Sequence, residues 1–331
     1  MDEILLQRAP ENRLELMPSI VIPDDYPAVM AASDAYQRLI EKTPVLYYDT
    51  LPRTEDELLD RISDSEVVVN IRSSSKFTPD VFDACPRMKL LSIWGTGTDN
   101  VDLTAAVRHG VTVTNTPGVS AVSIAEHSLM LMLAVARRVV TVNSAVVAGE
   151  WPRGQSVQLY EKTLGIIGLG AIGRQFARLA QGIGMRVIAW TMHPNPALGI
   201  ELVELDELLR VSDVVSLHLR QSSDTVGFLS RAQFQLMKRG AILVNTARGP
   251  IVNEADLIEA LREGRIAGAG LDVFDVEPLP SGHRLTKLDN VVLTPHCAGI
   301  TPEVLEAGLA LAIENIESFL NGKPQNVVVP R

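Results

Sequence analysis

Short apolar runs alternate with amphipathic stretches along most of this chain. Runs such as 66–70 and 90–94 have the length and β-branched content of buried strands. Between them, stretches such as Glu55–Ile62 place apolar residues at helical spacing. Strands that alternate with helices are typical of proteins in which helices cover both faces of a parallel sheet. We therefore expect an α/β fold with doubly wound parallel sheets.

The alternation falls into two parts, and 331 residues are enough for two domains. Four strands and their helices form a first, smaller unit. A second unit begins near Gly110 and continues to about residue 298. The last helix, Pro302–Leu320, is expected to return to the first unit. We predict one domain from residues 1–103 and 299–331, with residues 1–18 as a loosely ordered arm, and a second domain from residues 104–298.

Composition narrows the classes of function. Apolar residues make up 46% and charged residues 21% of the chain, which are globular values. A net charge of −10 argues against a nucleic-acid-binding surface. The N-terminus lacks the pattern of a signal peptide, and the apolar stretch Ser128–Ala136 is too short to span a membrane. We expect a cytoplasmic protein with no nucleic acid, membrane or metal partner, in which Cys85 and Cys297 are free thiols.

A glycine-rich segment opens a βαβ unit in the second part. Gly168, Gly170 and Gly173 fit the pattern G-x-G-x-x-G. The strand-like run Leu164–Ile167 precedes them and the amphipathic stretch Arg174–Gly182 follows, which is the context that a dinucleotide-binding site requires. We expect the pyrophosphate of a dinucleotide to lie at the helix N-terminus, where Arg174 is a candidate for an added positive charge.

The residue that usually selects the cofactor is absent. Dinucleotide sites commonly place an Asp or Glu about 20 residues after the glycines, where it accepts from the adenosine ribose. Here the next strand, Met185–Trp190, is followed by Thr191, and no acidic residue appears before Glu201. No arginine is present there to attract a 2′-phosphate either. NAD is the predicted cofactor, and NADP remains open.

Three apolar runs near the end of the chain are each followed by a charged or ionisable side chain. Arg248 ends 241–248, Glu277 lies in 268–278, and His296 ends 290–296. Ligands of open α/β sheets bind outside the carboxyl ends of the strands. An arginine suits a carboxylate and an imidazole exchanges protons near neutral pH. We expect a site that binds an acid and moves a proton.

Several motifs in this order resemble the D-isomer-specific 2-hydroxyacid dehydrogenase family, which includes phosphoglycerate and D-lactate dehydrogenases and hydroxypyruvate reductases. The resemblance covers nearly all of residues 60–300. The motifs are Gly-Thr-Gly-Thr-Asp-Asn-Val-Asp (95–102), Ala-Glu-His (125–127), the glycine segment, Asn-Thr-Ala-Arg-Gly (245–249), Leu-Asp-Val-Phe-Asp-Val-Glu-Pro (271–278) and Thr-Pro-His (294–296).

The resemblance implies a Rossmann cofactor domain, a smaller flavodoxin-like substrate domain, and hydride transfer between a nicotinamide and C2 of a D-2-hydroxy or 2-oxo acid. It implies that Arg248 clamps the substrate carboxylate and that His296 is the acid/base. Glu277 would orient the imidazole and favour its protonated form. Cofactor contacts are then expected from Gly168, Gly170, Ala171, Ile172, Gly173, Arg174, Thr191, His218, Thr246, Ala247, Asp272, His296 and Gly299.

Substrate selection is expected in the first part of the chain. The segment 71–76 follows a strand, and its backbone N–H groups are suited to a carboxylate. Arg72 or Lys76 are candidates for a distal anion, and 95–97 resembles the family's second substrate loop. The candidate substrate residues are Arg72, Ser73, Ser74, Gly95, Thr96, Gly97 and Arg248.

Two further hypotheses accompany this interpretation. A dinucleotide-sensing corepressor on the same scaffold would keep the same three side chains and need little turnover. Family resemblance also implies a homodimer formed through the cofactor domain. The apolar helix Ser123–Arg138 is a candidate for that surface, although packing within one chain explains its composition equally well.

Overall fold

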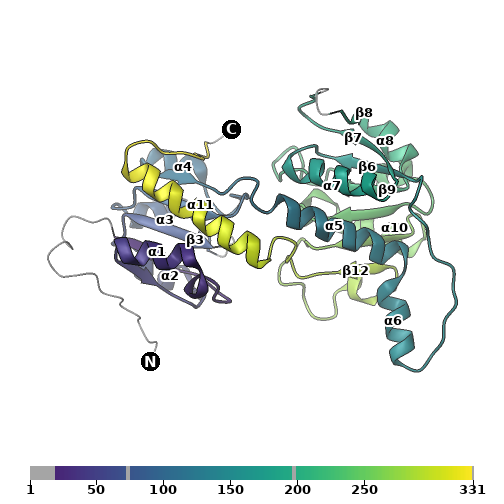
Figure 1. The fold of residues 1–331 in the computed structure, drawn as a ribbon, viewed down its shortest axis with the longest axis horizontal. Coiled ribbons are helices and arrows are strands. Elements are labelled where there is room, and N and C mark those ends of the chain that lie inside the picture. Colours follow the sequence, from purple (N-terminus) through teal and green to yellow (C-terminus); the bar gives the residue numbers. More distant parts are fainter. Residues whose placement is uncertain (1–18, 72–74, 196–198, 330–331) are drawn as a thin grey trace. The chain divides into compact units, whose positions relative to one another are not determined.

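The computed structural model describes residues 19–71, 75–195 and 199–329, which form two compact units (Figure 1). Unit 1 comprises the chain up to Ser120 and from Thr301 onward, and unit 2 comprises Ala121–Ile300. Residues 104–120 therefore belong to unit 1 and not to the cofactor domain in which the sequence pattern placed them. The reason is that their strand pairs with the first sheet. The predicted N-terminal arm, 1–18, lies outside the described residues.

Unit 1 contains a five-stranded parallel sheet in the order β2-β1-β3-β4-β5. This is the flavodoxin-like strand order, as the family resemblance implied. Its central strands are buried along their whole length, which explains their continuous apolar sequence. The strands are β1 (Ile20–Ile22), β2 (Val45–Tyr47), β3 (Val67–Ile71), β4 (Leu90–Trp94) and β5 (Thr112–Thr114).

The helices of unit 1 begin at polar caps. Thr54, Thr78 and Thr301 each accept a first-turn N–H with the hydroxyl, which is why the helices start where they do. The last helix packs on β4 and on the first helix, and its apolar residues complete the core of this unit. The helices are α1 (Asp34–Lys42), α2 (Glu55–Ile62), α3 (Pro79–Ala84), α4 (Leu103–Arg108), α11 (Pro302–Leu320) and a 3-10 turn, Met30–Ala32.

Unit 2 contains a seven-stranded parallel sheet in the order β12-β11-β10-β9-β6-β7-β8. The order reverses between β6 and β9, as in the Rossmann fold, so the ligand crevice lies where these two strands end. The strands are β6 (Thr163–Ile167), β7 (Arg186–Trp190), β8 (Glu201–Leu202), β9 (Val214–Leu217), β10 (Ile242–Asn245), β11 (Gly268–Leu271) and β12 (Val291–Leu293).

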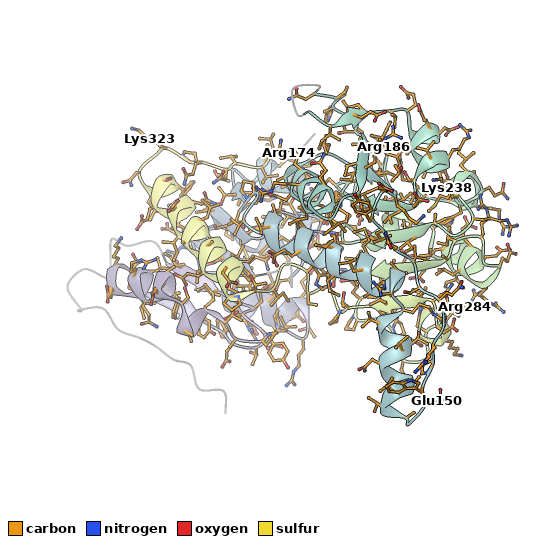
Figure 2. The ribbon with its side chains drawn as sticks, turned by 45° about the vertical axis from the view of Figure 1, so that its right-hand side comes forward. Glu150, Arg174, Arg186, Lys238, Arg284 and Lys323 are labelled. Atoms are coloured by element: carbon orange, nitrogen blue, oxygen red, sulfur yellow. The ribbon has the colours of Figure 1, made fainter. Side chains whose placement is uncertain are left out.

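Helix α5 (Ala121–Ala136) runs across one face of this sheet, in contact with α7, β10 and β11. Its Leu131 and Met132 are fully buried, so core packing accounts for much of its apolar composition. Helix α6 (Val139–Val147) has no buried residue and ends just before Glu150 (Figure 2). The remaining helices are α7 (Ala171–Gly182), α8 (Leu205–Val211), α9 (Arg231–Leu236), α10 (Glu254–Arg262) and the 3-10 turns Gly249–Ile251 and Arg284–Lys287.

Candidate active site

The glycine segment turns from β6 into α7 so tightly that side chains on its first and third glycines would clash with the backbone. Gly168 has a φ of +102°, and a Cβ there would lie 2.5 Å from the carbonyl oxygen of His218. A Cβ on Gly173 would lie 2.2 Å from the carbonyl oxygen of Gly168. Only glycine fits either position, because backbone atoms cannot move away as a flexible side chain can. The first and third glycines thus allow the tight turn and the close packing of α7 on β6.

Helix α7 presents an N-terminus that is suited to an anion. Gly170 is its N-cap, and no side chain among the described residues accepts a first-turn N–H at that cap. The helix starts at Ala171, three residues before the start at Arg174 that its amphipathic pattern predicted. Ala171, Ile172 and Arg174 consequently all lie in its first turn. Uncapped N–H groups and the helix dipole favour a phosphate here. The turn thus fits the pyrophosphate of a dinucleotide.

Thr191 follows directly on β7, where the cofactor-selecting residue is expected. Its hydroxyl accepts the backbone N–H of His193 at 3.4 Å, which turns the chain away from the strand. Thr191 is partly exposed and His193 is exposed. Neither carries a carboxylate, so the strand end has the neutral character that its sequence indicated.

His218 directly follows β9 and packs against the glycine segment. Its Nε2 is 3.0 Å from the hydroxyl of Ser216, and its ring packs edge-on against Phe176 of α7. Burial lowers the pKa of His218 to about 3, so the ring is neutral. Its carbonyl oxygen abuts Gly168, which makes backbone packing its clearest contribution to the crevice.

A sharp turn after β10 carries Arg248. Asn245 shapes it, because its Oδ1 accepts the N–H of Ala247 at 3.0 Å and its Nδ2 donates to the carbonyl of Arg248 at 3.0 Å. Thr246 is buried, with its hydroxyl 2.9 Å from that of Ser128 in α5. The sequence motif included Asn245, but its role in forming the turn was not predicted.

Glu277 and His296 form a hydrogen-bonded pair. The distance between Nδ1 of His296 and Oε2 of Glu277 is 2.7 Å, while Oε1 accepts the N–H of Phe274 at 2.9 Å. Burial alone would raise the pKa of Glu277. The hydrogen bonds from His296 and Phe274, with the charge of Arg248 nearby, outweigh burial and lower it. The carboxylate is therefore ionised at neutral pH, and Nε2 of His296 is left to act on a substrate.

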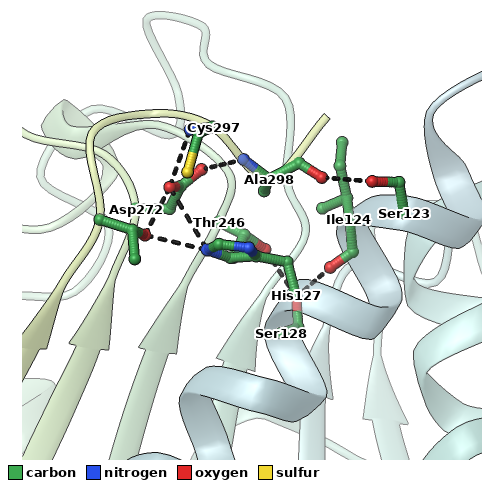
Figure 3. Close-up of polar contacts among 9 residues, drawn as sticks. Ser123, Ile124, His127, Ser128, Thr246, Asp272, Cys297 and Ala298 are labelled. Carbon is green, nitrogen blue, oxygen red and sulfur yellow. Dashed lines mark hydrogen bonds and ion pairs between the residues drawn. The ribbon is translucent and has the colours of Figure 1, made fainter. Parts of the chain in front are cut away.

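The segment that carries His296 is held on Asp272, the residue that follows β11 (Figure 3). Asp272 is buried, and its carboxylate accepts the hydroxyl of Thr294 at 2.5 Å and the N–H groups of Cys297 and Ala298 at 3.0 and 2.9 Å. The N–H of His296 donates to the carbonyl of Asp272 at 2.8 Å. These bonds hold His296 at a φ of +51°, in the left-handed region that non-glycine residues seldom adopt.

Helix α5 adds residues to this network that sequence reasoning missed. His127 lies with its Nε2 2.9 Å from the hydroxyl of Thr294 and 3.5 Å from Oδ1 of Asp272. Ser123 donates to the carbonyl of Ala298 at 2.7 Å. Burial alone would raise the pKa of Asp272, but the hydrogen bonds from His127, Thr294 and the backbone lower it. The Ala-Glu-His motif drew attention to His127, but the sequence did not indicate which residues its imidazole contacts.

Of the remaining predicted residues, some lie in unit 1 and some cannot be placed. Gly95 and Thr96 are tied to Thr116, whose hydroxyl accepts the N–H of Gly95 at 2.9 Å. Gly97 belongs to the same loop of unit 1, whereas Ala247 and Gly299 lie in unit 2 beside the groups described above. Arg72, Ser73 and Ser74 lie outside the described residues.

Unit 2 thus combines a Rossmann sheet, a glycine turn suited to a phosphate and a carboxylate–imidazole pair, which are the features of a dinucleotide-dependent oxidoreductase. Residues 129–298 match the family described as "D-isomer specific 2-hydroxyacid dehydrogenase, NAD binding domain". The chain belongs to this family. Three predictions are confirmed at the level of the family: the fold, NAD as the cofactor of this class, and hydride transfer to or from a 2-hydroxy acid as its reaction class. Nothing in the comparisons supports the corepressor hypothesis.

Three similar proteins illustrate the range of the family. The chain is 40% identical to a D-3-phosphoglycerate dehydrogenase of Methanocaldococcus jannaschii over 83% of its own length and 54% of that protein. It is 38% identical to a glyoxylate reductase of Korarchaeum cryptofilum, over 86% and 88% of the two chains. An acyclic imino acid reductase, solved with NADPH and D-Arg, has 30% identity and a TM-score of 0.87, over 94% and 100% of the chains.

No single helix among the described residues has the length and composition to cross a bilayer. Helices α5 and α6 reach the length and apolar composition of a membrane span only when they are taken together, as a pair bent by 62°.

Proposed function

We propose that this protein catalyses the NAD(H)-dependent interconversion of a 2-oxo acid and the corresponding D-2-hydroxy acid. The observation that carries the proposal is the 2.7 Å contact between His296 and Glu277 on the same sheet as the glycine turn. A carboxylate on Nδ1 fixes the ring and stabilises the imidazolium, which is what a proton donor to a carbonyl oxygen requires.

When bound, NADH would supply a hydride to C2 of the oxo acid in the reduction. Arg248 binds the substrate carboxylate through its planar guanidinium and polarises the C2 oxygen. His296 donates the proton on Nε2 to that oxygen, so the carbonyl becomes a hydroxyl and the imidazole becomes neutral. In the oxidation, the neutral imidazole removes the hydroxyl proton. Glu277 keeps Nδ1 protonated in both directions.

Asp272 and the turns at Gly168 and Thr246 bind the cofactor in this proposal. The buried carboxylate of Asp272 accepts from the nicotinamide carboxamide, and the N-terminus of α7 binds the pyrophosphate. The backbone of Thr246 and Ala247 runs along the cofactor. Loop 95–97, together with 71–76, selects the substrate side chain.

The substrate proposed is a 2-oxo acid with a short side chain, because relatives that the chain matches over most of both lengths include a glyoxylate reductase and a hydroxypyruvate reductase. NADH oxidation with glyoxylate, hydroxypyruvate, pyruvate, phenylpyruvate and 2-ketoisocaproate tests this. We expect kcat/KM to be highest for one of the first three. Tight NADH binding with no oxidation by any of the five acids would contradict the enzymatic function.

We propose NAD as the main cofactor and NADP as a second one, because Thr191 offers no charge to repel a 2′-phosphate. Thr191→Asp should lower kcat/KM for NADPH by about 10–100-fold, since a like-charge contact of this kind costs roughly 1–3 kcal/mol. The value for NADH should stay the same or rise, and Thr191→Ser serves as the neutral control. Equal effects on the two cofactors would refute the placement of Thr191 beside the ribose.

We also propose that a second copy of the chain covers α6. Its exposed valines include Val147, which is 81% exposed, and Trp151 just beyond it is 74% exposed. Apolar groups gathered on one helix in this way are typical of an interface. Sedimentation should show a dimer that Val147→Glu converts to a monomer. The control is Val107→Glu, at an exposed valine of α4, which should leave the dimer intact. A monomeric wild-type protein would refute the proposal.

A further inference from the structure

Beside the His296–Glu277 pair lies a second cluster with a different set of donor atoms. His127, Asp272 and Cys297 each offer one ligand atom, and these three atoms lie within 4.8 Å of one another. They come from α5, the end of β11 and the loop after β12; hydrogen bonds hold the side chains of His127 and Asp272, and Cys297 is held through its backbone N–H. Figure 3 shows the dashed contacts that join His127 and Cys297 to the carboxylate. The donors are therefore assembled without any ligand.

Nitrogen, oxygen and sulfur together suit a borderline-soft cation. Thiolate and imidazole select Zn²⁺ or Co²⁺, whereas Mg²⁺ and Ca²⁺ prefer oxygen ligands alone. Zn²⁺ binds nitrogen and oxygen at about 2.0–2.2 Å in a tetrahedral arrangement, in which two such ligands are roughly 3.3–3.5 Å apart. The observed distance from Nε2 of His127 to Oδ1 of Asp272 is 3.5 Å. This edge of the cluster already has the dimension of a zinc site.

The neighbouring groups also favour this cluster over the nearby catalytic pair. Asp272 is held by the N–H groups of Cys297 and Ala298, which act as the outer-shell partners that orient a metal-binding carboxylate. Glu277, by contrast, lies within the field of the Arg248 guanidinium, which repels a cation. Cys297 is partly exposed, so its thiol is the group of this cluster that an incoming ion meets first, whereas the carboxylate is buried.

We propose that His127, Asp272 and Cys297 form an inhibitory site for a thiophilic divalent cation, Zn²⁺ above all. Binding forms one bond each from the metal to Nε2, to a carboxylate oxygen and to sulfur. The thiol proton leaves to solvent. The ring proton of His127, which Nε2 donates to the hydroxyl oxygen of Thr294 in the absence of metal, moves to Nδ1, so Thr294 loses this contact. The fourth position of the tetrahedron remains for water. Asp272 is then no longer available to the cofactor, an effect that rests on the proposed function.

Co²⁺ and Zn²⁺ added to the purified full-length protein test the site without turnover. Co²⁺ should give the intense thiolate charge-transfer absorption of a tetrahedral Co–S centre, and Zn²⁺ should displace it with one ion bound per chain. Cys297→Ser should abolish the band. His127→Gln should weaken binding by more than about 100-fold, since loss of an outer-shell partner alone costs 10–100-fold. Cys85→Ser, at the buried thiol of unit 1, is the matched control and should bind like wild type.

A band that persists in Cys297→Ser, or that is absent from a folded wild-type protein, would overturn the proposal. So would unchanged Zn²⁺ affinity in His127→Gln, because the metal would then be held elsewhere. Circular dichroism confirms that each variant is folded, and Cys297→Ala repeats the test with a smaller side chain.

Inhibition is measured against the uninhibited rate of each variant. Zn²⁺, but not Mg²⁺, should raise the KM for NADH in the wild type and in Cys85→Ser, with at least tenfold less effect in Cys297→Ser. Equal inhibition of all three would refute the link to activity. A chain that binds Zn²⁺ here but oxidises NADH with none of the acids would contradict the proposed function and leave the metal site standing.

Discussion

The pair formed by Glu277 and His296 gives the sharpest test of the proposed chemistry. Glu277→Gln keeps the size of the side chain but removes its charge and one of its two acceptors. At present Oε1 accepts from Phe274 and Oε2 is 2.7 Å from Nδ1 of His296. A glutamine can satisfy only one of these donors, so the imidazolium loses its stabilising partner and part of its orientation.

The size of the effect follows from the exposure of the pair. An exposed ion pair contributes about 0.2–1 kcal/mol, and a hydrogen bond to a charged group about 1.5–3 kcal/mol. The side chains of His296 and Glu277 are 45% and 35% exposed, which places their interaction between these limits. A loss of about 1–2 kcal/mol corresponds to roughly a 5–30-fold fall in rate. Reduction needs the protonated ring, so kcat/KM for reduction should fall by this factor, most strongly at the alkaline end of the pH range.

The assay is kcat/KM for reduction of the best oxo acid between about pH 5 and about pH 9, the range that brackets histidine titration. A matched control exists in the same unit. Glu254 and His283 form another carboxylate–imidazole pair, at 3.1 Å, outside the proposed site. Glu254→Gln should leave the profile unchanged. Superimposable profiles for wild type and Glu277→Gln, with chemistry limiting the rate, would refute the assigned role of Glu277.

Three other changes probe the acid/base group, the cofactor turn and a buried carboxylate. His296→Ala should lower kcat by about 10²–10⁴-fold and leave the Kd for NADH, measured by fluorescence, within about twofold, while near-wild-type turnover would remove His296 from the mechanism. Gly173→Ala should weaken NADH binding at least tenfold, because its Cβ would lie 2.2 Å from the carbonyl oxygen of Gly168, and an unchanged Kd would argue against a tight turn there. Asp24 is fully buried, and burial raises its pKa to about 6. The stability that this group contributes is therefore complete below the ordinary aspartate pKa and is lost as pH rises through about 6. Denaturant unfolding at a series of pH values should show this slope in the wild type and not in Asp24→Asn; the same slope in both would assign it to other groups.

Local patterns in the sequence were sufficient to predict most elements, whereas the Rossmann and flavodoxin-like types of the two sheets were implied by the family resemblance. The glycine segment was recognisable because its requirements are met within a few residues: a strand, a turn that excludes side chains, and a helix. Helix α11 was predicted with its observed bounds because Thr301 and Pro302 mark its start. The sequence analysis also expected this helix to return to the first unit, and the structure places it there.

The features that were missed depend on distant parts of the chain. The strand β5 looks like the start of a new unit, because a strand followed by a turn does not reveal which sheet it joins. His127 and Thr294 are 167 positions apart in the sequence, so their contact could not be derived from spacing. The left-handed conformation of His296 likewise depends on Asp272, which lies on the neighbouring strand.

The interrupted course of the chain through unit 1 has a consequence for biosynthesis. Leu309, Ile313 and Ile316 of α11 belong to the same core cluster as Ile20 and Trp94. During translation this part of the core cannot close until all of Ala121–Ile300 has been made, which takes roughly 10–40 s at about 5–20 residues per second. Unit 2 is continuous and has its full sequence sooner. The core of unit 1 therefore closes only after the whole sequence of unit 2 has been made, and the apolar face of β4 stays uncovered in the interval.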